Sequence, residues 1–296
     1  MKNIKIAAVV VTYNRFVLLQ KCIAALRDQT HKLDAIIVVD NASTDFTGEW
    51  LDKQKDLIVI HQANLGGSGG FHRGIKEAFE RKFDWIWTMD DDVNPTPECL
   101  EKLLEYISPD IGMLCPQRRM NGVVSLGETL KFNLSNPFVP LKRKLLQSDI
   151  KESPIDIEGM CFEGPLISSN TVKYIGLPNR DLFILFDDTD YSYRAVLAGL
   201  KVKYIPVAIL NKEDIKVQGE GRNWKTVYGL RNLIYFAHTY GKNSFFCFLY
   251  PIFVCIRYIV GYFRHFIKFD NVYYKKDLFL FFRAYLDGIR GKLGKY

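Results

Sequence analysis

The chain has 296 residues, of which 48% are hydrophobic and 25% are charged, with a net charge of +7. This composition excludes an intrinsically disordered chain and supplies enough apolar residues for one large packed domain, or for a domain with an extension. The six cysteines are scattered without a Cys-x-x-Cys pair, which excludes a disulfide framework and a structural zinc site and indicates a reducing compartment.

The first part of the chain alternates short apolar segments with segments of helical spacing. β-Branched, apolar runs predict buried strands at 4–11, 36–39, 57–61 and just before Asp90. Helical spacing between them predicts helices at 17–29 and 71–82. Because connections of this length form crossovers, the alternation predicts an α/β fold with a single, mainly parallel sheet flanked by helices.

The same alternation continues to about residue 241. The expected elements are a helix at 96–107, a strand at 111–115, core segments at 158–169 and 183–186, helices at 170–175 and 191–200, and a strand at 202–209. Between 121 and 153 the pattern weakens, with Gly, Pro and basic residues interspersed, which predicts a mobile or variable excursion. We therefore expect a domain over 1–241, with halves of about 1–118 and 119–241, followed by an extension over 242–296.

Polar residues follow the carboxyl ends of the first three expected strands. Ligands of open α/β sheets bind beyond this edge, so the adjacent loops predict a nucleotide pocket. The glycine-rich loop lacks Gly-Lys-Ser/Thr and is not a P-loop, but its exposed N–H groups at a helix start favour an anion such as a diphosphate. Asp40 is equally suited to capping the following helix. The candidate ligand-binding residues are Thr12, Tyr13, Asn14, Arg15, Asp40, Asn64, Gly66, Gly67, Gly69, Gly70 and Arg73.

Three consecutive carboxylates, Asp90, Asp91 and Asp92, end the fourth expected strand. On an extended backbone, Asp90 and Asp92 would point one way and Asp91 the other. A converging pair of carboxylates suits a hard cation such as Mg²⁺ or Mn²⁺, and Mg²⁺ shares its remaining coordination with substrate phosphates and water. The alternative is a solvated turn whose aspartates cap the next helix.

Five motifs together resemble family 2 glycosyltransferases with the GT-A fold. They are Val9-Val-Val-Thr-Tyr-Asn-Arg15, Val39-Asp-Asn-Ala-Ser-Thr-Asp45, Asn64-Leu-Gly-Gly-Ser-Gly-Gly-Phe71, Met89-Asp-Asp-Asp92 and Phe186-Asp-Asp-Thr-Asp190. They occur in the family's order over residues 4–240, and the glycine loop and triple Asp look most similar to the galactofuranosyltransferase branch, then to rhamnosyltransferases. The resemblance implies a Rossmann-like sheet, a UDP-sugar donor near Asp90 and Asp91, Mg²⁺ or Mn²⁺ on Asp90 and Asp92, and inversion at the anomeric carbon.

The resemblance also places the catalytic base at Asp188, with Asp187 beside it. An inverting transfer needs a carboxylate that takes the proton of the acceptor hydroxyl, while a metal stabilises the leaving diphosphate. The alternative is that these two carboxylates cap the following helix. Asp190 and Arg194 are four residues apart on that helix and are expected to pair.

Two further segments resemble acceptor-side elements of the family. Glu163 and Gly164 lie in a stretch that lines the acceptor side in relatives, although a turn carboxylate is usually just solvated. Arg231, in Tyr-x-x-Arg-Asn, is a candidate for acceptor or phosphate contact, or alternatively for helix packing. Many relatives carry a metal-binding His after the strand at 202–209, where this chain has Asn211, so the third protein ligand stays open.

The excess positive charge lies entirely in the tail. Residues 242–296 contain ten Lys and Arg against three Asp and Glu, whereas the first 241 are balanced at 30 against 30. Arg257, Arg264, Lys268 and Lys275 fall near one line if a single helix continues past residue 270, with aromatic residues on the other faces. This pattern predicts binding to a membrane surface. The alternative is packing on the core or on a second subunit, and no nucleic-acid recognition fold accompanies the charge.

These features predict a cytoplasmic, metal-dependent, inverting glycosyltransferase, peripheral at the inner face of the cell membrane. It would move a sugar, with galactofuranose as the best guess, from a UDP-sugar to a glycan or polyprenyl-linked acceptor of a bacterial surface polysaccharide. The alternatives are a rhamnosyl- or other hexosyltransferase of the same fold, and a catalytically silent glycan-binding or assembly subunit. A sugar-nucleotide-forming nucleotidyltransferase is disfavoured, because Thr-Tyr-Asn-Arg replaces a glycine-rich basic loop after the first strand.

Overall fold

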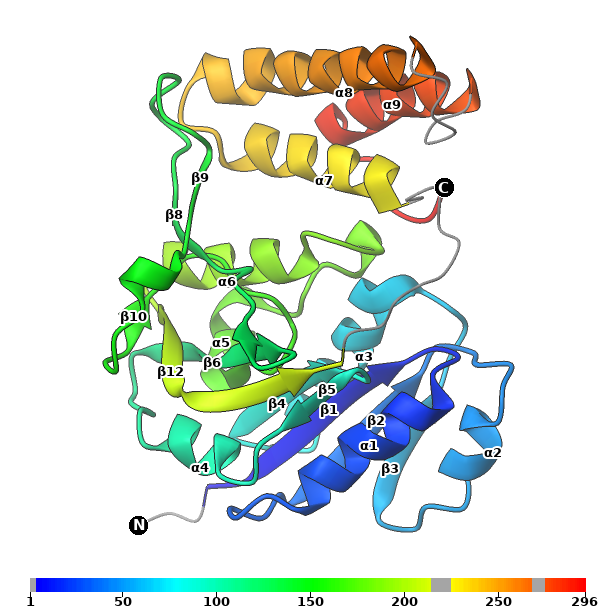
Figure 1. Ribbon diagram of the computed structural model, residues 1–296, viewed down its shortest axis with the longest axis vertical. Coiled ribbons are helices and arrows are strands. Elements are labelled where there is room, and N and C mark those ends of the chain that lie inside the picture. The colour runs from blue at the N-terminus through cyan, green and yellow to red at the C-terminus, as the bar shows by residue number, and fades with distance from the viewer. Residues whose placement is uncertain (1–3, 214–224, 268–274) are drawn as a thin grey trace.

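The computed structural model describes residues 4–213, 225–267 and 275–296, without the side chains of 264–277. Figure 1 shows an α/β body that contains the large sheet, and three long helices that lie together at the opposite end. These helices are α7 (Lys225–Tyr240), α8 (Tyr250–Ile267) and α9 (Lys275–Ile289). Together with the residues between α7 and α8 they form the helical end of the molecule. A hairpin of β8 (Thr129–Phe132) and β9 (Lys142–Lys144) reaches from the body to the helices (Figure 1).

Over the described residues, the central sheet has ten strands, eight of them in the order β10-β12-β6-β11-β4-β1-β2-β3. Its core consists of parallel strands, namely β1 (Ile6–Thr12), β2 (Ala35–Asp40), β3 (Leu57–His61) and β4 (Trp85–Asp90). Strands β6 (Ile111–Met120) and β12 (Lys201–Lys212) are also parallel, and β11 (Leu166–Ser168) runs antiparallel between β4 and β6. Short antiparallel additions are β5 (Val93–Pro95), β7 (Val123–Val124) and β10 (Ile155–Asp156). The predicted α/β fold with a mainly parallel sheet is confirmed.

Helices cover both faces of the sheet, so every residue of β1 is buried. Alternate residues of β1 pack on opposite layers, because side chains alternate along a strand. Helices α1 (Phe16–Arg27) and α4 (Cys99–Leu104) supply one layer, and α3 (Gly66–Glu80), α5 (Ser169–Ile175) and α6 (Asp187–Leu197) supply the other. The short α2 (Thr47–Leu51) lies beside β3.

The glycine-rich segment is the first turn of α3 and not a loop before it. The helix begins at Gly66, whereas the sequence predicted a start near residue 71. A Cβ at Gly70 would lie 2.4 Å from Val11 Cγ1, and one at Gly74 would lie 2.3 Å from Val9 Cγ1. These glycines therefore allow α3 to pack directly on β1, which is a packing requirement that local propensity does not reveal.

The segment 121–153, predicted as a mobile or variable excursion, contains strands that the sequence pattern did not predict. Besides the hairpin, it includes β7 and a short 3₁₀ turn at Gln147–Asp149. Phe132, Leu134 and Leu141 are buried against Phe236 and Phe246 of the helical end. The hairpin is ordered by packing on residues about one hundred positions later, which a local pattern cannot show.

Two other segments differ from the sequence pattern. Residues 183–186 form a turn after the 3₁₀ helix η2 (Arg180–Leu182), and in that turn Phe183, Leu185 and Phe186 have φ angles of 66°, 66° and 69°. A π-turn, η3 (Phe245–Leu249), precedes α8, and α8 ends at Ile267. The predicted basic line therefore depends on side chains that, except for Arg257, lie outside the described residues.

Candidate active site

The carboxyl ends of the parallel strands bring the predicted donor loops together. In the sheet register, Thr12 of β1 lies opposite Asp40 of β2, and Val11 lies opposite Asp90 of β4. Asn14, with φ of 52°, accepts a hydrogen bond on Oδ1 from the N–H of Thr44 at 2.6 Å, so the loops after β1 and β2 are tied to each other. The edge that the sequence predicted as a pocket is therefore one connected surface.

Asp91 and Asp92 share a single cation, Arg15. Arg15 Nη1 donates to Asp91 Oδ1 at 3.0 Å and to Asp92 Oδ2 at 3.1 Å, and Thr12 Oγ1 donates to Asp91 Oδ2 at 2.7 Å. Strand β4 ends at Asp90 and a turn follows, so alternation along a strand does not extend to Asp91 and Asp92. The charges of Asp90 and Asp92 nevertheless both act on Lys212, whereas Asp91 bonds to Thr12. Asp91 is held inside the protein, which leaves Asp90 and the second oxygen of Asp92 for a ligand.

Lys212 lies on the other side of Asp92. Its Nζ is 3.7 Å from Asp92 Oδ1 and donates to Glu163 Oε1 at 2.5 Å. Arg118 donates to the other oxygen of Glu163 and, at 2.9 Å, to buried Glu128. Glu163 is thus a bridge between two cations and not a solvated turn residue.

The charges in this cluster do not balance. Among the described residues, five carboxylates (Asp90, Asp91, Asp92, Glu128 and Glu163) lie near three cations (Arg15, Arg118 and Lys212), an excess of two negative charges when all are ionised. Burial, and then the charges of Glu163 and Asp92, raise the pKa of Asp90 well above its usual range. Although burial opposes the shift, Arg118 and Lys212 lower the pKa of Glu163. The surroundings therefore disfavour the ionised form of Asp90.

This arrangement fits a divalent cation that a bound substrate completes. Within the described part of the chain, no three His, Cys, Asp or Glu side chains converge on a preformed metal site. However, Asp92 Oδ1 is buried without a hydrogen-bond partner among those residues. The charge of Asp92 is also one of those that raise the pKa of Asp90. Two carboxylates suit a hard cation that takes its other ligands from phosphate and water. Asn211, the open third position, is exposed on β12, and its neighbour Lys212 is the residue near Asp92.

Helix α6 begins with the predicted catalytic base, Asp188, and the carboxylate beside it, Asp187. Asp187 and Asp188 are the first two residues of that helix, and Asp188 Oδ1 accepts a hydrogen bond from the N–H of Thr189 at 2.5 Å. Burial is the main cause that raises the pKa of each of these two carboxyls. The charge of Glu163 raises the pKa of both Asp90 and Asp188, so one carboxylate lies within electrostatic reach of a metal candidate and of the base candidate.

A lysine from the hairpin lies beside Asp188. Lys142 Nζ is 4.2 Å from the centroid of the Phe186 ring, and its positive charge opposes the upward pKa shift of Asp188. The expected pair within α6 is also present, since Arg194 Nε donates to Asp190 Oδ2 at 2.9 Å. Asp190 also accepts a hydrogen bond from Tyr240 of α7 at 2.6 Å, which joins the body to the helical end.

Asp40 has partners on both oxygens. It accepts a hydrogen bond from the N–H of Ser43 at 2.9 Å, and its other oxygen lies 2.9 Å from His61 Nδ1. The hydrogen bond to Asp40 raises the pKa of His61. Asp40 therefore orders its own turn but does not cap the following helix α2, whose N-cap is Phe46. Nucleoside binding by Asp40 stays a prediction.

Several other predicted binding residues make contacts within the protein. Asn64 Oδ1 accepts a hydrogen bond from the N–H of Gly66 at 3.0 Å. Arg73 pairs with Glu77, 2.6 Å away on the same helix, and the N–H of Gly164 donates to Thr88 at 2.8 Å. Tyr13 is 45% exposed. Donor or acceptor binding by these residues, and by Gly67 and Gly69, stays a prediction.

Arg231 is buried between α7 and two loops. It is 1% exposed, and its guanidinium donates to the carbonyl oxygens of Gly294 at 2.6 Å and Leu182 at 3.0 Å. These contacts support the packing alternative, and direct acceptor contact stays a prediction. Sequence reasoning did not single out Lys212, Lys142 or Asn232 as functional residues. The absence of the family's histidine at Asn211 pointed to the region of Lys212, and the Arg-Asn pair at 231 and 232 pointed to Asn232.

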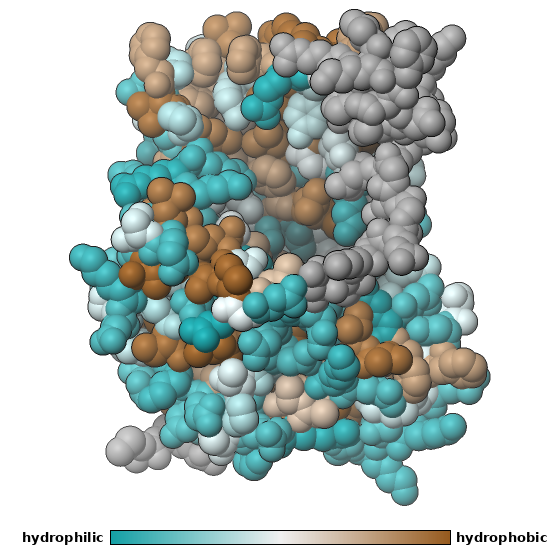
Figure 2. Space-filling model, in the orientation of Figure 1, coloured by the Kyte–Doolittle hydropathy of each residue, from teal (hydrophilic) through white to brown (hydrophobic). Residues whose placement is uncertain are grey.

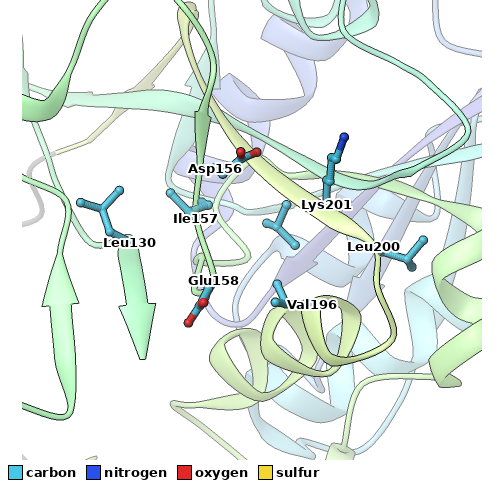
Figure 3. A pocket seen from close by; sticks show the side chains of 8 residues that line it. Leu130, Asp156, Ile157, Glu158, Val196, Leu200 and Lys201 are labelled. Atoms are coloured by element: carbon cyan, nitrogen blue, oxygen red, sulfur yellow. The ribbon is translucent and has the colours of Figure 1, made fainter. Parts of the chain in front are cut away.

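Figure 3 shows a separate cavity of about 210 Å³ on the side of the body near β10 and α6. Two carboxylates and one lysine lie among apolar side chains there, and none of the predicted site residues lines it. Its lining residues are Leu130, Asp156, Ile157, Glu158, Val196, Leu200, Lys201 and Val202. The cavity is therefore distinct from the carboxylate cluster at the sheet edge.

Residues 7–161, more than half of the chain, match the family described as glycosyl transferase family 2. The chain belongs to glycosyltransferase family 2. The matched residues include every member of the carboxylate cluster except Glu163 and Lys212. Two solved structures agree with the fold. GalNAc-T7 with UDP, GalNAc and Mn²⁺ aligns with 80% of this chain and over 51% of the GalNAc-T7 chain, with a TM-score of 0.62 and 14% identity. TarS of S. aureus in complex with UDP matches 85% and 69%, with a TM-score of 0.56 and 16% identity. The family 2 assignment and the GT-A fold are therefore confirmed.

Curated relatives of this family 2 chain include two kinds of transferase. Galactofuranosyltransferase GlfT1 of Mycolicibacterium smegmatis is 31% identical over 211 residues, which is 66% of this chain and 66% of the relative. The dTDP-rhamnosyl transferase RfbF of Shigella flexneri is 26% identical over 230 residues, 73% of each chain. The chain thus spans slightly less than two thirds of the length of the GlfT1 relative.

Proposed function

We propose that this family 2 protein is a metal-dependent, inverting glycosyltransferase that uses a UDP-sugar. The support that carries the proposal is that the charge of Glu163 acts both on Asp90, beside Asp92 at the sheet edge, and on Asp188 at the start of α6. Donor and acceptor chemistry require these two kinds of carboxylate close together. A UDP-linked donor is supported by the solved structures of GalNAc-T7 and TarS, both of which are complexes with UDP.

On the donor side, Asp90 and Asp92 would hold Mg²⁺ or Mn²⁺. The cation, when bound, supplies positive charge that stabilises the leaving diphosphate. Arg15 and Lys212 already lie against Asp92 and provide further positive charge at the same edge. At the start of α3 the N–H groups of Gly66 and Ser68 bond within the protein, so this end would attract a diphosphate through the positive end of the helix dipole.

On the acceptor side, Asp188 would act as the base. It removes the proton of the acceptor hydroxyl as that oxygen bonds to the anomeric carbon, and the bond from this carbon to the UDP oxygen breaks. Attack from the face opposite UDP inverts the configuration. Burial raises the pKa of Asp188, which brings a carboxylate closer to the pH at which it accepts a proton effectively.

For the donor sugar, we propose galactofuranose. The support is the GlfT1 relative at 31% identity, which exceeds the 26% identity of the rhamnosyl transferase RfbF. A rhamnosyl or other hexosyl donor is the alternative that RfbF favours. By the same reasoning the acceptor is a glycan or a polyprenyl-linked glycan of a bacterial surface polysaccharide.

We further propose that the helical end lies on the cytoplasmic face of the membrane. One described stretch, Phe245–Phe263, is long and apolar enough to span a bilayer, and 28% of it is buried. One face of α8 packs on α7 and α9, which favours a helix lying in the interface over a spanning one. The exposed face holds large apolar residues within an arc of about 100°, with exposed Arg257 beside it. Those residues are Ile252, Phe253, Ile256, Val260 and Phe263.

The apolar surface continues beyond α8. Figure 2 shows apolar atoms along the end of the molecule that α8 forms. At the tip of the hairpin, Phe138 is 93% exposed, and the hairpin is bonded to the turn before α8 through Lys242 N–H to Leu134 O at 2.8 Å. Aromatic and basic residues together favour the headgroup layer.

A donor panel tests the proposed function. Purified protein with Mn²⁺ is incubated with UDP-galactofuranose, UDP-galactose, UDP-glucose or dTDP-rhamnose and a synthetic glycan acceptor, and transfer is measured by mass spectrometry. We expect transfer from UDP-galactofuranose, loss of transfer with a chelator, and a fall of at least about 100-fold in Asp92→Asn and in Asp188→Asn.

Three results contradict the assignment. Full activity of Asp92→Asn or Asp188→Asn removes that residue from the chemistry. Transfer that persists in the chelator removes the metal. UDP binding without turnover, in the presence of metal and every acceptor, favours a catalytically silent glycan-binding subunit.

A further inference from the structure

The turn that leads into Asp187 and Asp188 has an unusual backbone. Three of its residues, Phe183, Leu185 and Phe186, have φ between 66° and 69°, although none is a glycine. Side chains with a Cβ rarely adopt this conformation, and it persists only where the surrounding structure holds it. The start of α6, and with it the direction of Asp188, therefore depends on what holds the turn.

One buried amide holds it. The Nδ2 group of Asn232, which is 0% exposed on α7, donates to Leu182 O at 3.0 Å, Ile184 O at 3.0 Å and Leu185 O at 2.8 Å. Arg231 Nε donates to Asn232 Oδ1 at 2.9 Å, which fixes the amide with its N–H groups toward the turn. Two of these carbonyls lie in the turn and the third, Leu182 O, lies just before it and also accepts from Arg231 Nη2 at 3.0 Å. Helix α7 therefore bonds to the backbone at three points around the turn.

The opposite side of the turn touches the donor side. The N–H of Ser68, in the first turn of α3, donates to Phe183 O at 3.2 Å. A Cβ at Gly66 would lie 2.0 Å from that same oxygen, so the two segments are in direct contact. The turn at 183–186 is therefore held between α7 and the glycine-rich start of α3.

We propose that Asn232 is a positioning residue of the sugar transfer. It acts through the turn at 183–186, fixing Asp188 toward the acceptor hydroxyl and fixing the turn against the start of α3. The inference rests on the proposed role of Asp188 as base. It gives the helical end a second task besides membrane binding, because α7 carries the amide that sets the catalytic geometry.

The test compares two α7 variants in the full-length protein. Asn232→Asp keeps the side-chain shape but places an oxygen against three carbonyl oxygens. His238→Phe is the control, because His238 Nδ1 pairs with Cys247 O at 2.8 Å in the helical end, away from the turn. We measure kcat with a soluble acceptor, the Kd of UDP by calorimetry, melting temperature, and deuterium exchange of the backbone amides of 182–190.

For Asn232→Asp we expect kcat to fall about 100-fold, the Kd of UDP to stay within about threefold, and the amides of 182–190 to exchange at least about tenfold faster. His238→Phe should leave kcat unchanged, and the amides of 182–190 should still exchange slowly in this variant, even if its melting temperature falls as much as that of Asn232→Asp. The inference is overturned if Asn232→Asp keeps kcat within about threefold, if its 182–190 exchange is unchanged, or if both variants lose kcat equally. Absence of transfer by the wild-type protein would instead refute the proposed function, and the exchange experiment would still decide whether Asn232 holds the turn.

Discussion

Lys142 influences Asp188 although it lies 46 positions earlier, on a hairpin strand that the sequence pattern did not predict. Burial is the largest influence on the Asp188 carboxyl and raises its pKa. Hydrogen bonds from Thr189 and the charge of Lys142 lower this pKa, and the charge of Glu163 raises it. Burial in turn lowers the pKa of Lys142. The base is therefore tuned by residues from three separate elements.

Replacing Lys142 should shift the pH dependence of transfer. Lys142→Met removes the positive charge, so the pKa of Asp188 rises further. Because the base must be ionised, activity is lost as the pH falls through this pKa, and the acid limb of the kcat/KM profile should move to higher pH by about one unit. Lys142→Arg, which keeps the charge, is the control. A limb that stays in place or moves to lower pH would contradict the interpretation.

Asp187 should lower stability at neutral pH. Burial, and then the charge of Asp188, raise its pKa to about 8. A carboxyl whose pKa is raised on folding gives its full stability below its unfolded value near 3.8, and that stability is lost as the pH rises toward 8. Asp187→Asn should therefore melt at the same temperature as wild type near pH 4 and at a higher temperature at pH 8, by the equivalent of at least about 1 kcal/mol.

Thermal unfolding at intervals from pH 4 to 8 checks this expectation. A variant that is less stable than wild type at pH 8 would show that the Asp187 carboxylate makes a favourable interaction that its neighbours do not reveal.

At the scale of elements, the sequence predicted an anion-binding loop before α3. The structure has instead a helical turn that packs against the turn at 183–186. Gly66→Ala should lower both stability and activity, because the new Cβ would lie 2.0 Å from Phe183 O at a position whose φ is +74°. We expect a loss of about 2 kcal/mol in unfolding free energy and of at least about tenfold in kcat. The matched control is Gly67→Ala, since a Cβ there meets nothing within 4 Å.

Denaturant unfolding and transfer assays of the two alanine variants provide the measurement. Equal effects at the two positions would contradict a contact between α3 and the turn at 183–186.

The elements differ in how far local sequence determines them. Strand β1 and strand β3 were predicted to within two residues at each end, because a short apolar β-branched run bounded by polar residues leaves little choice. The turn at 183–186 was predicted as a core segment because Phe183 and Phe186 are apolar. Its left-handed backbone could not be predicted locally, because it depends on Asn232, a residue far away in sequence. The hairpin at 129–144 was missed for the same reason, because its apolar residues pack on α7 and on the turn before α8.

At the scale of the whole molecule, the apolar face of α8 should govern membrane binding. The double variant Phe253→Asp with Ile256→Asp puts two charges on that exposed face and should reduce binding to vesicles with anionic lipid at least about tenfold. Transfer to a soluble acceptor should stay unchanged. Tyr174→Asp, at a residue 71% exposed on α5 of the body, is the matched control.

Cosedimentation with vesicles and light scattering distinguish the outcomes. Unchanged vesicle binding contradicts the membrane proposal. A wild-type dimer that the double variant disrupts would instead assign the face to a second copy of the chain.

The sequence by itself determined the family, the parallel core of the sheet and the polar strand ends, because strand periodicity and short motifs are local properties. It also placed the excess positive charge in the last 55 residues, which needs only a count along the chain. Only the tertiary structure decided which side chains meet: Arg15 between Asp91 and Asp92, Lys212 in the region of the absent histidine, Lys142 beside Asp188, and Asn232 on the turn before it. The physical reason is that a buried charge or a strained backbone is stabilised by whichever groups the fold brings within about 4 Å, and separation along the chain does not limit that choice.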